Sequence, residues 1–205
     1  IGWCDWSSDV CSSDLHLDIY GDKSHLEESF RLFANQLKSG GQLYAKAGLP
    51  LGDVKEQKAT YSITEVADFS GTDIHIKDHQ YIFNINAPGG SYKEWKSGMP
   101  GRHNVENVIA AIAVALKMNI PADVIKEGVA SFSGVKRRFE YHINTPDCTY
   151  IDDYAHHPEE LRAAISSVKE LYHDKKITGV FQPHLFTRTR DFADGFAESL
   201  SLLDS

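Results

Sequence analysis

The sequence GRHNVENVIAAIAVAL (101–116) decides the interpretation of the fold, because a strongly apolar helix begins there with polar side chains at its start. The Ala, Val and Ile content of 104–116 predicts a well-buried helix. Asn104 and Asn107 are three residues apart and therefore share one face of its first turn. Two carboxamides on one face could read the edge of a planar base such as adenine. Asn104 could equally be only an N-cap.

The segments around this helix predict a mixed α/β fold. Upstream, 24–41 has helical spacing, with Ser24 and Glu27 as a capping box. A short strand is expected at 42–48, and an antiparallel three-stranded meander over 59–86, with turns at 70–71 and 78–79. A second buried helix is expected at 121–132.

From residue 149 the order becomes strand, helix, strand, helix, which is typical of the start of a parallel α/β sheet. The expected strands are TYIDDY (149–154) and ITGVFQPH (177–184). Ligands of such sheets bind outside the carboxyl ends of the strands. Asp152, Asp153, Tyr154, His156 and His184 fall at these ends. The chain stops after two such units, so we expect the domain to continue beyond it.

Three further segments gather candidate binding residues. The run GVKRRFE (134–140) carries Arg138, and arginine suits phosphate recognition, although a charge run is more often a solvated face. In DDYAHHP (152–158), a histidine could contact the substrate directly, donate a hydrogen bond to a residue that contacts the substrate, or cap the next helix. In QPHLFTRTR (182–190), Arg188 and Arg190 favour an anionic ligand over a plain surface loop.

Composition excludes some classes of function. The chain has 205 residues, 41% of them apolar, and a net charge of −8, so we expect no nucleic-acid partner because a broad basic face is missing. No apolar run is long enough to span a membrane. If the first 15 residues are set aside, Cys148 is the one remaining thiol, which suits a reducing, cytoplasmic location.

The first 15 residues, IGWCDWSSDVCSSDL, differ from everything after them. They lack the basic and apolar regions of a signal peptide, and Cys4 and Cys11 have no second ligand pair for zinc. With one choice of codons, the stretch 5–15 encodes a string that resembles a common sequencing-library adapter. We therefore expect residues 1–15 not to be native.

Together, GRHNVENVIAAIAVAL, FSGVKRRFE, DDYAHHPEEL and FQPHLFTRTRDF resemble motifs of the Mur ligases, ATP-dependent amide-forming enzymes of peptidoglycan synthesis. HLDIYGD (16–22) looks like the end of a further motif of that family. The resemblance implies part of a central ATP-binding domain at 16–143 and the start of a C-terminal Rossmann-like domain at 144–205. It implies ATP and Mg²⁺ as cofactors, and UDP-N-acetylmuramate and L-alanine as substrates.

The resemblance also implies roles for individual residues. His16 would help to hold magnesium, Asn104 and Asn107 would contact adenine, Arg138 would approach the phosphates and Asp153 would bind ribose. The residues implied to face the amino acid and the muramoyl group are Tyr154, His156, His184 and Arg188. Leu185 replaces an arginine that many members carry, so Arg188 or Arg190 would have to bind that carboxylate.

Two alternatives remain open from the sequence. A recycling relative attaches a whole tripeptide to the same muramate. The chain could also be an inactive nucleotide-binding fragment, because no G-x-x-x-x-G-K-[ST] phosphate loop occurs in it. We expect it to be inactive alone, and tight magnesium-dependent ATP binding by 16–205 would contradict that.

Overall fold

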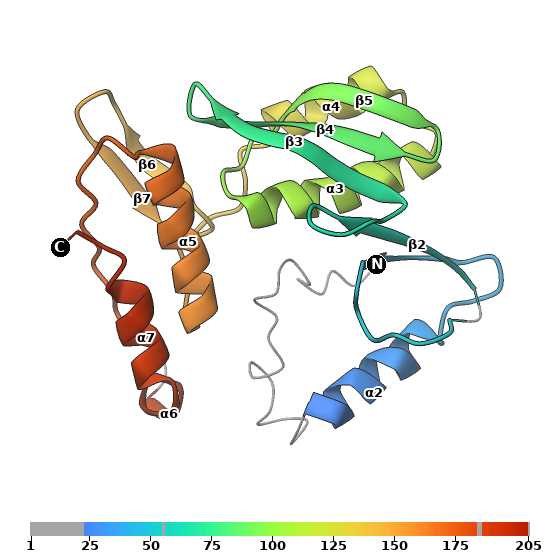
Figure 1. The fold of residues 1–205 in the computed structure, drawn as a ribbon, viewed down its shortest axis with the longest axis horizontal. Coiled ribbons are helices and arrows are strands. Elements are labelled where there is room, and N and C mark those ends of the chain that lie inside the picture. Colours follow the sequence, from blue (N-terminus) through green and yellow to red (C-terminus); the bar gives the residue numbers. More distant parts are fainter. Residues whose placement is uncertain (1–22, 55, 184–185, 205) are drawn as a thin grey trace.

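A five-stranded mixed sheet forms the larger half of the molecule in the computed structural model, which describes residues 23–54, 56–183 and 186–204 (Figure 1). Its strands are β1 (Gln42–Lys46), β2 (Gln57–Ser62), β3 (Phe69–Lys77), β4 (Gln80–Ala87) and β5 (Gly90–Lys96). They lie side by side in chain order. β1, β2 and β3 run parallel to one another, whereas β3, β4 and β5 pair antiparallel.

Some of the helices lie beside this sheet, and the others belong to a smaller second half of the molecule. They are α2 (Lys23–Ala34), α3 (Arg102–Lys117), α4 (Ala122–Ser131), α5 (Pro158–Leu171), α6 (Phe186–Asp191) and α7 (Ala193–Leu200). A two-stranded antiparallel hairpin, β6 (Glu140–Asn144) and β7 (Thr149–Asp152), completes the described elements. In Figure 1 this hairpin lies with α5 and α7 on one side of the molecule, and the large sheet with α3 and α4 lies on the other.

The main core forms where α3 packs on β1 to β4. Ile109 and Ile112 of α3 and Phe83 and Ile85 of β4 are completely buried in it. Gly71 in β3 permits this contact, because a Cβ atom there would lie 2.4 Å from Ile109. The buried face repeats at helical spacing, which is why this apolar segment could be predicted as a helix.

The mixed α/β class predicted from the sequence is confirmed, but the meander was wrong in detail. β2 pairs in parallel with its neighbours, and the antiparallel set is β3, β4 and the unpredicted β5. The turn expected at 70–71 lies inside β3. The turn at 78–79 is confirmed, with left-handed φ of 51° and 57° at Asp78 and His79.

Three further sequence predictions were wrong. The helix expected at 121–132 forms as α4, but it is not well buried, because Ile125 is its one buried residue. Ser24 cannot cap α2, because it lies inside that helix. The strand expected at 177–184 does not form over the described residues 177–183. Ile177 instead exchanges hydrogen bonds with Asp204, donating its N–H to the carboxylate and accepting the Asp204 N–H. Among the described residues β7 pairs only with β6, and the predicted parallel pairing of β7 with a strand at 177 does not form.

Candidate functional site

α3 carries the first pair of predicted site residues, Asn104 and Asn107. The N-cap of α3 is Gly101, with φ of 99° and no side-chain cap, so the alternative of Asn104 as an N-cap was wrong. The Asn104 amide instead donates to the Pro100 carbonyl at 2.6 Å. The Asn107 side chain is half-buried and forms no hydrogen bond with the described residues. Its carboxamide is therefore available to a ligand.

The loop before β6 carries Arg138 in an unusual backbone conformation. Its neighbours Arg137 and Phe139 both have left-handed φ, 59° and 51°, which non-glycine residues rarely adopt. Such conformations persist only where surrounding contacts enforce them. Here the Arg137 N–H donates to Glu140 Oε2 at 2.8 Å, and the Phe139 N–H donates to Asp153 Oδ2 at 2.8 Å.

Asp153 therefore joins two segments of the predicted site. Its other carboxylate oxygen accepts the Ala155 N–H at 2.8 Å. The residue as a whole is exposed, but neighbouring atoms crowd its carboxyl group, and the loss of hydration raises its pKa. The two backbone donors favour the ionised form and oppose that shift. Both oxygens keep a lone pair, so a ribose hydroxyl could still donate to them.

Tyr154 and His156 lie against this loop. The Tyr154 N–H donates to the Arg137 carbonyl at 2.7 Å, and its ring lies 5.9 Å from the Arg137 guanidinium. His156 Nδ1 lies 3.0 Å from the Tyr154 carbonyl oxygen and 3.2 Å from Glu160 Oε2. The contacts orient the imidazole. Sequence reasoning missed Glu160, although its spacing from the start of α5 is that of a capping box.

His157 has a structural role. It is buried and caps α5, where its side chain accepts from the Glu159 N–H and the Glu160 carboxylate accepts from the His157 N–H. Pro158 follows in the first turn, as predicted. Of the two adjacent histidines, His157 is thus the cap, and His156 is the one left at the edge of the site.

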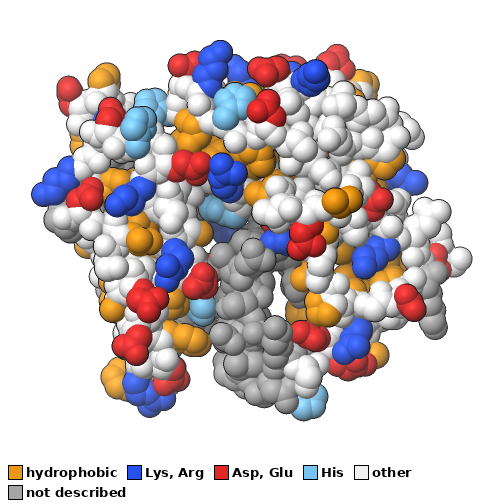
Figure 2. Space-filling view, viewed as in Figure 1, with side chains coloured by type: hydrophobic (Ala, Val, Ile, Leu, Met, Phe, Trp, Pro, Cys, Tyr) orange, Lys and Arg blue, Asp and Glu red, His pale blue; other side chains and the backbone are white. Residues whose placement is uncertain are grey.

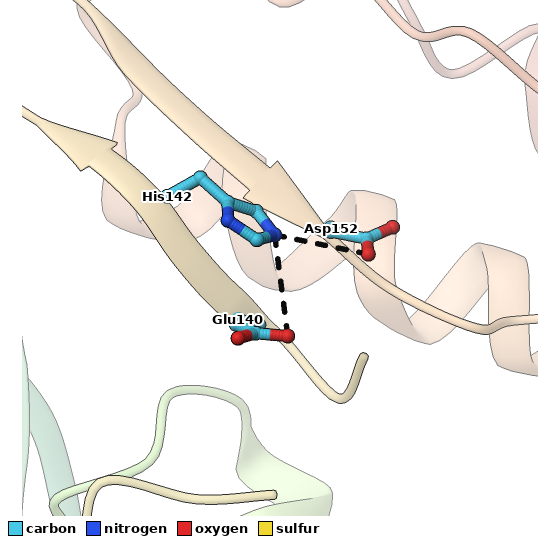
Figure 3. Close-up of side chains that lie close together, drawn as sticks. All are labelled: Glu140, His142 and Asp152. Carbon is cyan, nitrogen blue, oxygen red and sulfur yellow. Dashed lines mark ion pairs between the residues drawn. The ribbon is translucent and has the colours of Figure 1, made fainter. Parts of the chain in front are cut away.

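A third group, also missed from the sequence, braces the same loop. Glu140 and Asp152 pair directly across β6 and β7, and the hairpin register shifts between Tyr141 and Ile143. Figure 3 shows the His142 ring between the two carboxylates, with Nε2 4.0 Å from Glu140 Oε2 and 3.8 Å from Asp152 Oδ2. Opposed carboxylates repel, and the imidazole of His142 separates these two. Exposed groups of this kind are common without an ion, and we assign no metal to this one.

The two halves of the molecule also touch at the last turn of α5. Tyr81, which is 1% exposed, donates its hydroxyl to Glu170 at 2.6 Å, and Arg102 lies 3.4 Å from the same carboxylate. His79 contacts the Leu171 carbonyl at 3.0 Å and stacks on Tyr172. Burial and the hydrogen bond to Glu170 raise the pKa of Tyr81, so this hydroxyl stays protonated and donates. Arg102 begins α3, so the contact links α5 to the helix with the asparagine pair.

Several predicted residues are not placed by the structure. His16, His184 and Leu185 lie outside the described residues, as does the stretch 1–15. Arg188 belongs to α6, but its side chain is not described. Arg190 pairs with Asp191 at 2.7 Å on the surface. Within the described residues, the contacts unite Arg137, Phe139, Asp153, Tyr154 and His156, and do not join Asn104 or Asn107 to them.

On the face of the molecule in Figure 2, neither sign of charge dominates. Figure 2 shows Lys and Arg side chains interspersed with Asp and Glu on the face in view. Among the described helices, none is both long and apolar enough to cross a membrane. The candidate site therefore consists of a few placed polar groups and does not rely on a broad charged surface.

Comparison with known proteins defines the class. The Mur ligase middle domain matches residues 12–115, and the Mur ligase glutamate ligase domain matches residues 137–205. The chain belongs to the Mur ligase family. The first match includes residues 12–15 of the stretch predicted to be non-native, and the second begins before the boundary predicted after residue 143.

Particular relatives are also similar. The chain is 46% identical over 189 residues to a UDP-N-acetylmuramate–L-alanine ligase of Christiangramia forsetii, covering 92% of this chain and 41% of that protein. It is 44% identical over 196 residues to the ligase of the same name from Flavobacterium johnsoniae, covering 95% and 42%. The chain thus spans about two fifths of the length of these curated relatives.

Solved structures agree with the fold. The crystal structure of UDP-N-acetylmuramate–alanine ligase from Thermotoga maritima superposes with a TM-score of 0.76 at 26% identity, covering 94% of this chain and 42% of that one. Folylpolyglutamate synthetase from Lactobacillus casei, at 17% identity, shares the fold with a TM-score of 0.68, covering 89% and 46%.

Proposed function

We propose that this chain supplies part of an ATP-dependent ligase that joins L-alanine to the lactyl carboxylate of UDP-N-acetylmuramate in peptidoglycan synthesis. Residues 16–143 would contribute nucleotide-binding groups of the central domain, and 144–205 the start of the C-terminal domain. The observation that carries the proposal is the similarity, at 46% identity over 92% of the chain, to a ligase of that name. The placed polar groups on α3 and in the loop before β6 support it.

The nucleotide would lie against α3 and the loop before β6. Asn107 offers for an adenine edge a carboxamide that forms no hydrogen bond with the described residues, and Asn104 keeps its carbonyl oxygen after donating to Pro100. Asp153 would accept from the ribose hydroxyls with its remaining lone pairs. The loop held by Asp153 and Glu140 would present Arg138 to the phosphates.

The amino acid and the muramoyl group would lie at the other edge of this loop, near Tyr154 and His156. His184 and Arg188 would complete that part, with Arg188 pairing with a substrate carboxylate. Mg²⁺, when bound, would neutralise the phosphate oxygens, and His16 is its proposed ligand in this chain. We expect the protein to act in the cytoplasm on these small molecules, without a nucleic-acid or membrane partner.

The implied reaction has two steps. The lactyl carboxylate attacks the γ-phosphorus of ATP, releasing ADP and forming an acyl phosphate. The amine of L-alanine then attacks the acyl carbon, phosphate leaves, and the amine loses a proton as the amide forms. The cationic side chains of the site would stabilise the charge on the oxygens in both steps.

The test is ATP-dependent phosphate release by the full-length ligase that contains this segment, with UDP-N-acetylmuramate and either L-alanine or the tripeptide. We expect turnover with L-alanine. Turnover with the tripeptide but not with L-alanine would assign the recycling activity instead. We expect Arg188→Ala to raise the KM for L-alanine or the muramate by about 10-fold or more, far more than the KM for ATP. Unchanged constants for all three substrates would remove Arg188 from the site.

A further inference from the structure

A buried ion pair lies beneath the start of α3, and none of the proposed chemistry uses it. Lys46 Nζ lies 3.1 Å from Glu106 Oε2, and the two side chains are only 11% and 5% exposed. Removing two charges from water costs more than their attraction usually returns, so such a pair is weak evidence of a gain in stability. Its burial therefore calls for another role.

The pair lies at the carboxyl end of the parallel part of the sheet. Lys46 is the last residue of β1, and Ile63 directly follows the last residue of β2. The second Glu106 oxygen accepts the Ile63 N–H at 3.3 Å. One carboxylate of α3 therefore contacts the ends of two neighbouring parallel strands, at the edge where α/β sheets bind ligands.

Two other polar side-chain contacts at the start of α3 lie away from the parallel strands, since Asn104 donates to Pro100 and Arg102 pairs with Glu170. The N-cap of α3 is Gly101, which provides no side-chain hydrogen bond. Glu106 lies between Asn104 and Asn107 in the sequence. Its side chain is buried against the sheet, whereas both asparagine side chains are only half-buried. The depth at which Glu106 seats on Lys46 and Ile63 therefore sets where the two carboxamides lie.

We propose that Lys46 and Glu106 are positioning residues that fix the first turns of α3 on the parallel edge of the sheet and so hold Asn104 and Asn107 in place for the nucleotide base. The inference rests on the proposed nucleotide-binding function and deepens it. Neither residue touches the base. Their charges and hydrogen bonds act through the backbone of α3.

The experiment uses the full-length ligase with three variants. Glu106→Gln keeps the shape and the acceptor for Ile63 but removes the charge. Lys46→Met keeps the length of the side chain without its charge. The double variant Lys46→Met/Glu106→Gln removes both charges and keeps the acceptor for Ile63, so neither charge is left buried without its partner.

We expect all three variants to raise the KM for ATP by about 10-fold and to reduce the preference for ATP over GTP, because a small displacement of binding groups has large effects. The KM for L-alanine should stay the same. The double variant should recover the melting temperature without recovering the KM for ATP. An unchanged KM for ATP in a folded double variant would overturn the proposal, even if the single variants fail to fold.

Two controls separate this proposal from the function on which it rests. Glu198→Gln breaks an exposed ion pair with Arg162, 3.2 Å apart, and should leave both KM values unchanged. Asn107→Ala tests the adenine contact itself. If Asn107→Ala raises the KM for ATP and the Lys46 and Glu106 variants do not, the positioning role is wrong and the binding site stands. If Asn107→Ala also has no effect, the adenine site on α3 is wrong, and the positioning role falls with it.

Discussion

The two halves of this molecule hold their candidate site residues in different ways. On the large sheet, the asparagine pair belongs to a sixteen-residue helix whose inner face is completely buried at Val105, Ile109 and Ile112. In the smaller half, Arg138, Asp153 and His156 lie on loops, where backbone N–H groups donate to the carboxylates of Asp153 and Glu160. Apolar packing and a buried ion pair fix the first set, whereas carboxylates near the surface fix the second.

This difference has a consequence for binding. Groups on a packed helix keep their positions without a ligand, whereas groups on a hydrogen-bonded loop can shift when one carboxylate changes its partner or its charge. The side proposed to bind the base should therefore be preformed, and the side proposed to face the phosphates and the amino acid should be more adjustable.

The largest expected effect tests the packing of the large sheet. Phe83→Ala removes a completely buried ring and should lower the free energy of unfolding by about 3–5 kcal/mol. Ile143→Ala on β6, where the side chain is 45% exposed, should cost less than about 1 kcal/mol. Urea unfolding of the two variants measures both values. Equal losses would contradict the contrast between the halves.

A smaller effect is expected where the halves meet. Tyr81→Phe and Glu170→Gln each remove part of the contact between β4 and α5. Because Glu170 is partly exposed, a double-mutant cycle should give a coupling energy of about 1 kcal/mol. A coupling energy indistinguishable from zero would show that this hydrogen bond does not hold the two halves together.

The carboxylate at the start of α5 should matter by a similar amount. Glu160→Ala removes the acceptor of the His156 and His157 N–H groups and should cost about 1 kcal/mol in thermal or urea unfolding. Glu160→Gln is the matched control, because glutamine also completes a capping box. If the glutamine variant loses as much stability as the alanine variant, charge beside His156 and not capping is the source.

The smallest effect concerns the pKa of Asp153, which the structure raises above the ordinary value of about 4. At a pH between the unfolded and the folded pKa, the Asp153 carboxyl group is mostly protonated in the folded protein and mostly ionised in the unfolded chain. The corresponding stability is fully present below the unfolded pKa and is lost as the pH rises through the folded pKa. We expect a ¹³C NMR titration of the carboxyl group to give a midpoint above about 4.

Asp153→Asn should remove this part of the pH dependence of unfolding, and substitution of the exposed Asp147 by asparagine should not. A titration midpoint for Asp153 at or below its ordinary value would mean that its two N–H donors outweigh the loss of hydration.

The features that could be predicted from the sequence are those with a local pattern of residues. The helix at 102–117 and the hairpin turn at 78–79 follow from local patterns, and the four motifs led to the family. Parallel pairing of β2 could not be predicted, because an alternating strand is the same in either direction. The roles of Glu160, Glu106 and Glu170 depend on partners brought together by folding, and only Glu160 left a local signal in its spacing.

The most direct test of the account is where the base of a bound nucleotide touches the protein. Photolysis of the full-length ligase with 8-azido-ATP and Mg²⁺, followed by mass spectrometry of the peptides, locates that contact. The account predicts ATP-protected labelling in the first turns of α3, and none near the separate hollow lined by Lys96 and Lys126 between β5 and α4. Labelling at that hollow, with α3 unlabelled, would contradict it.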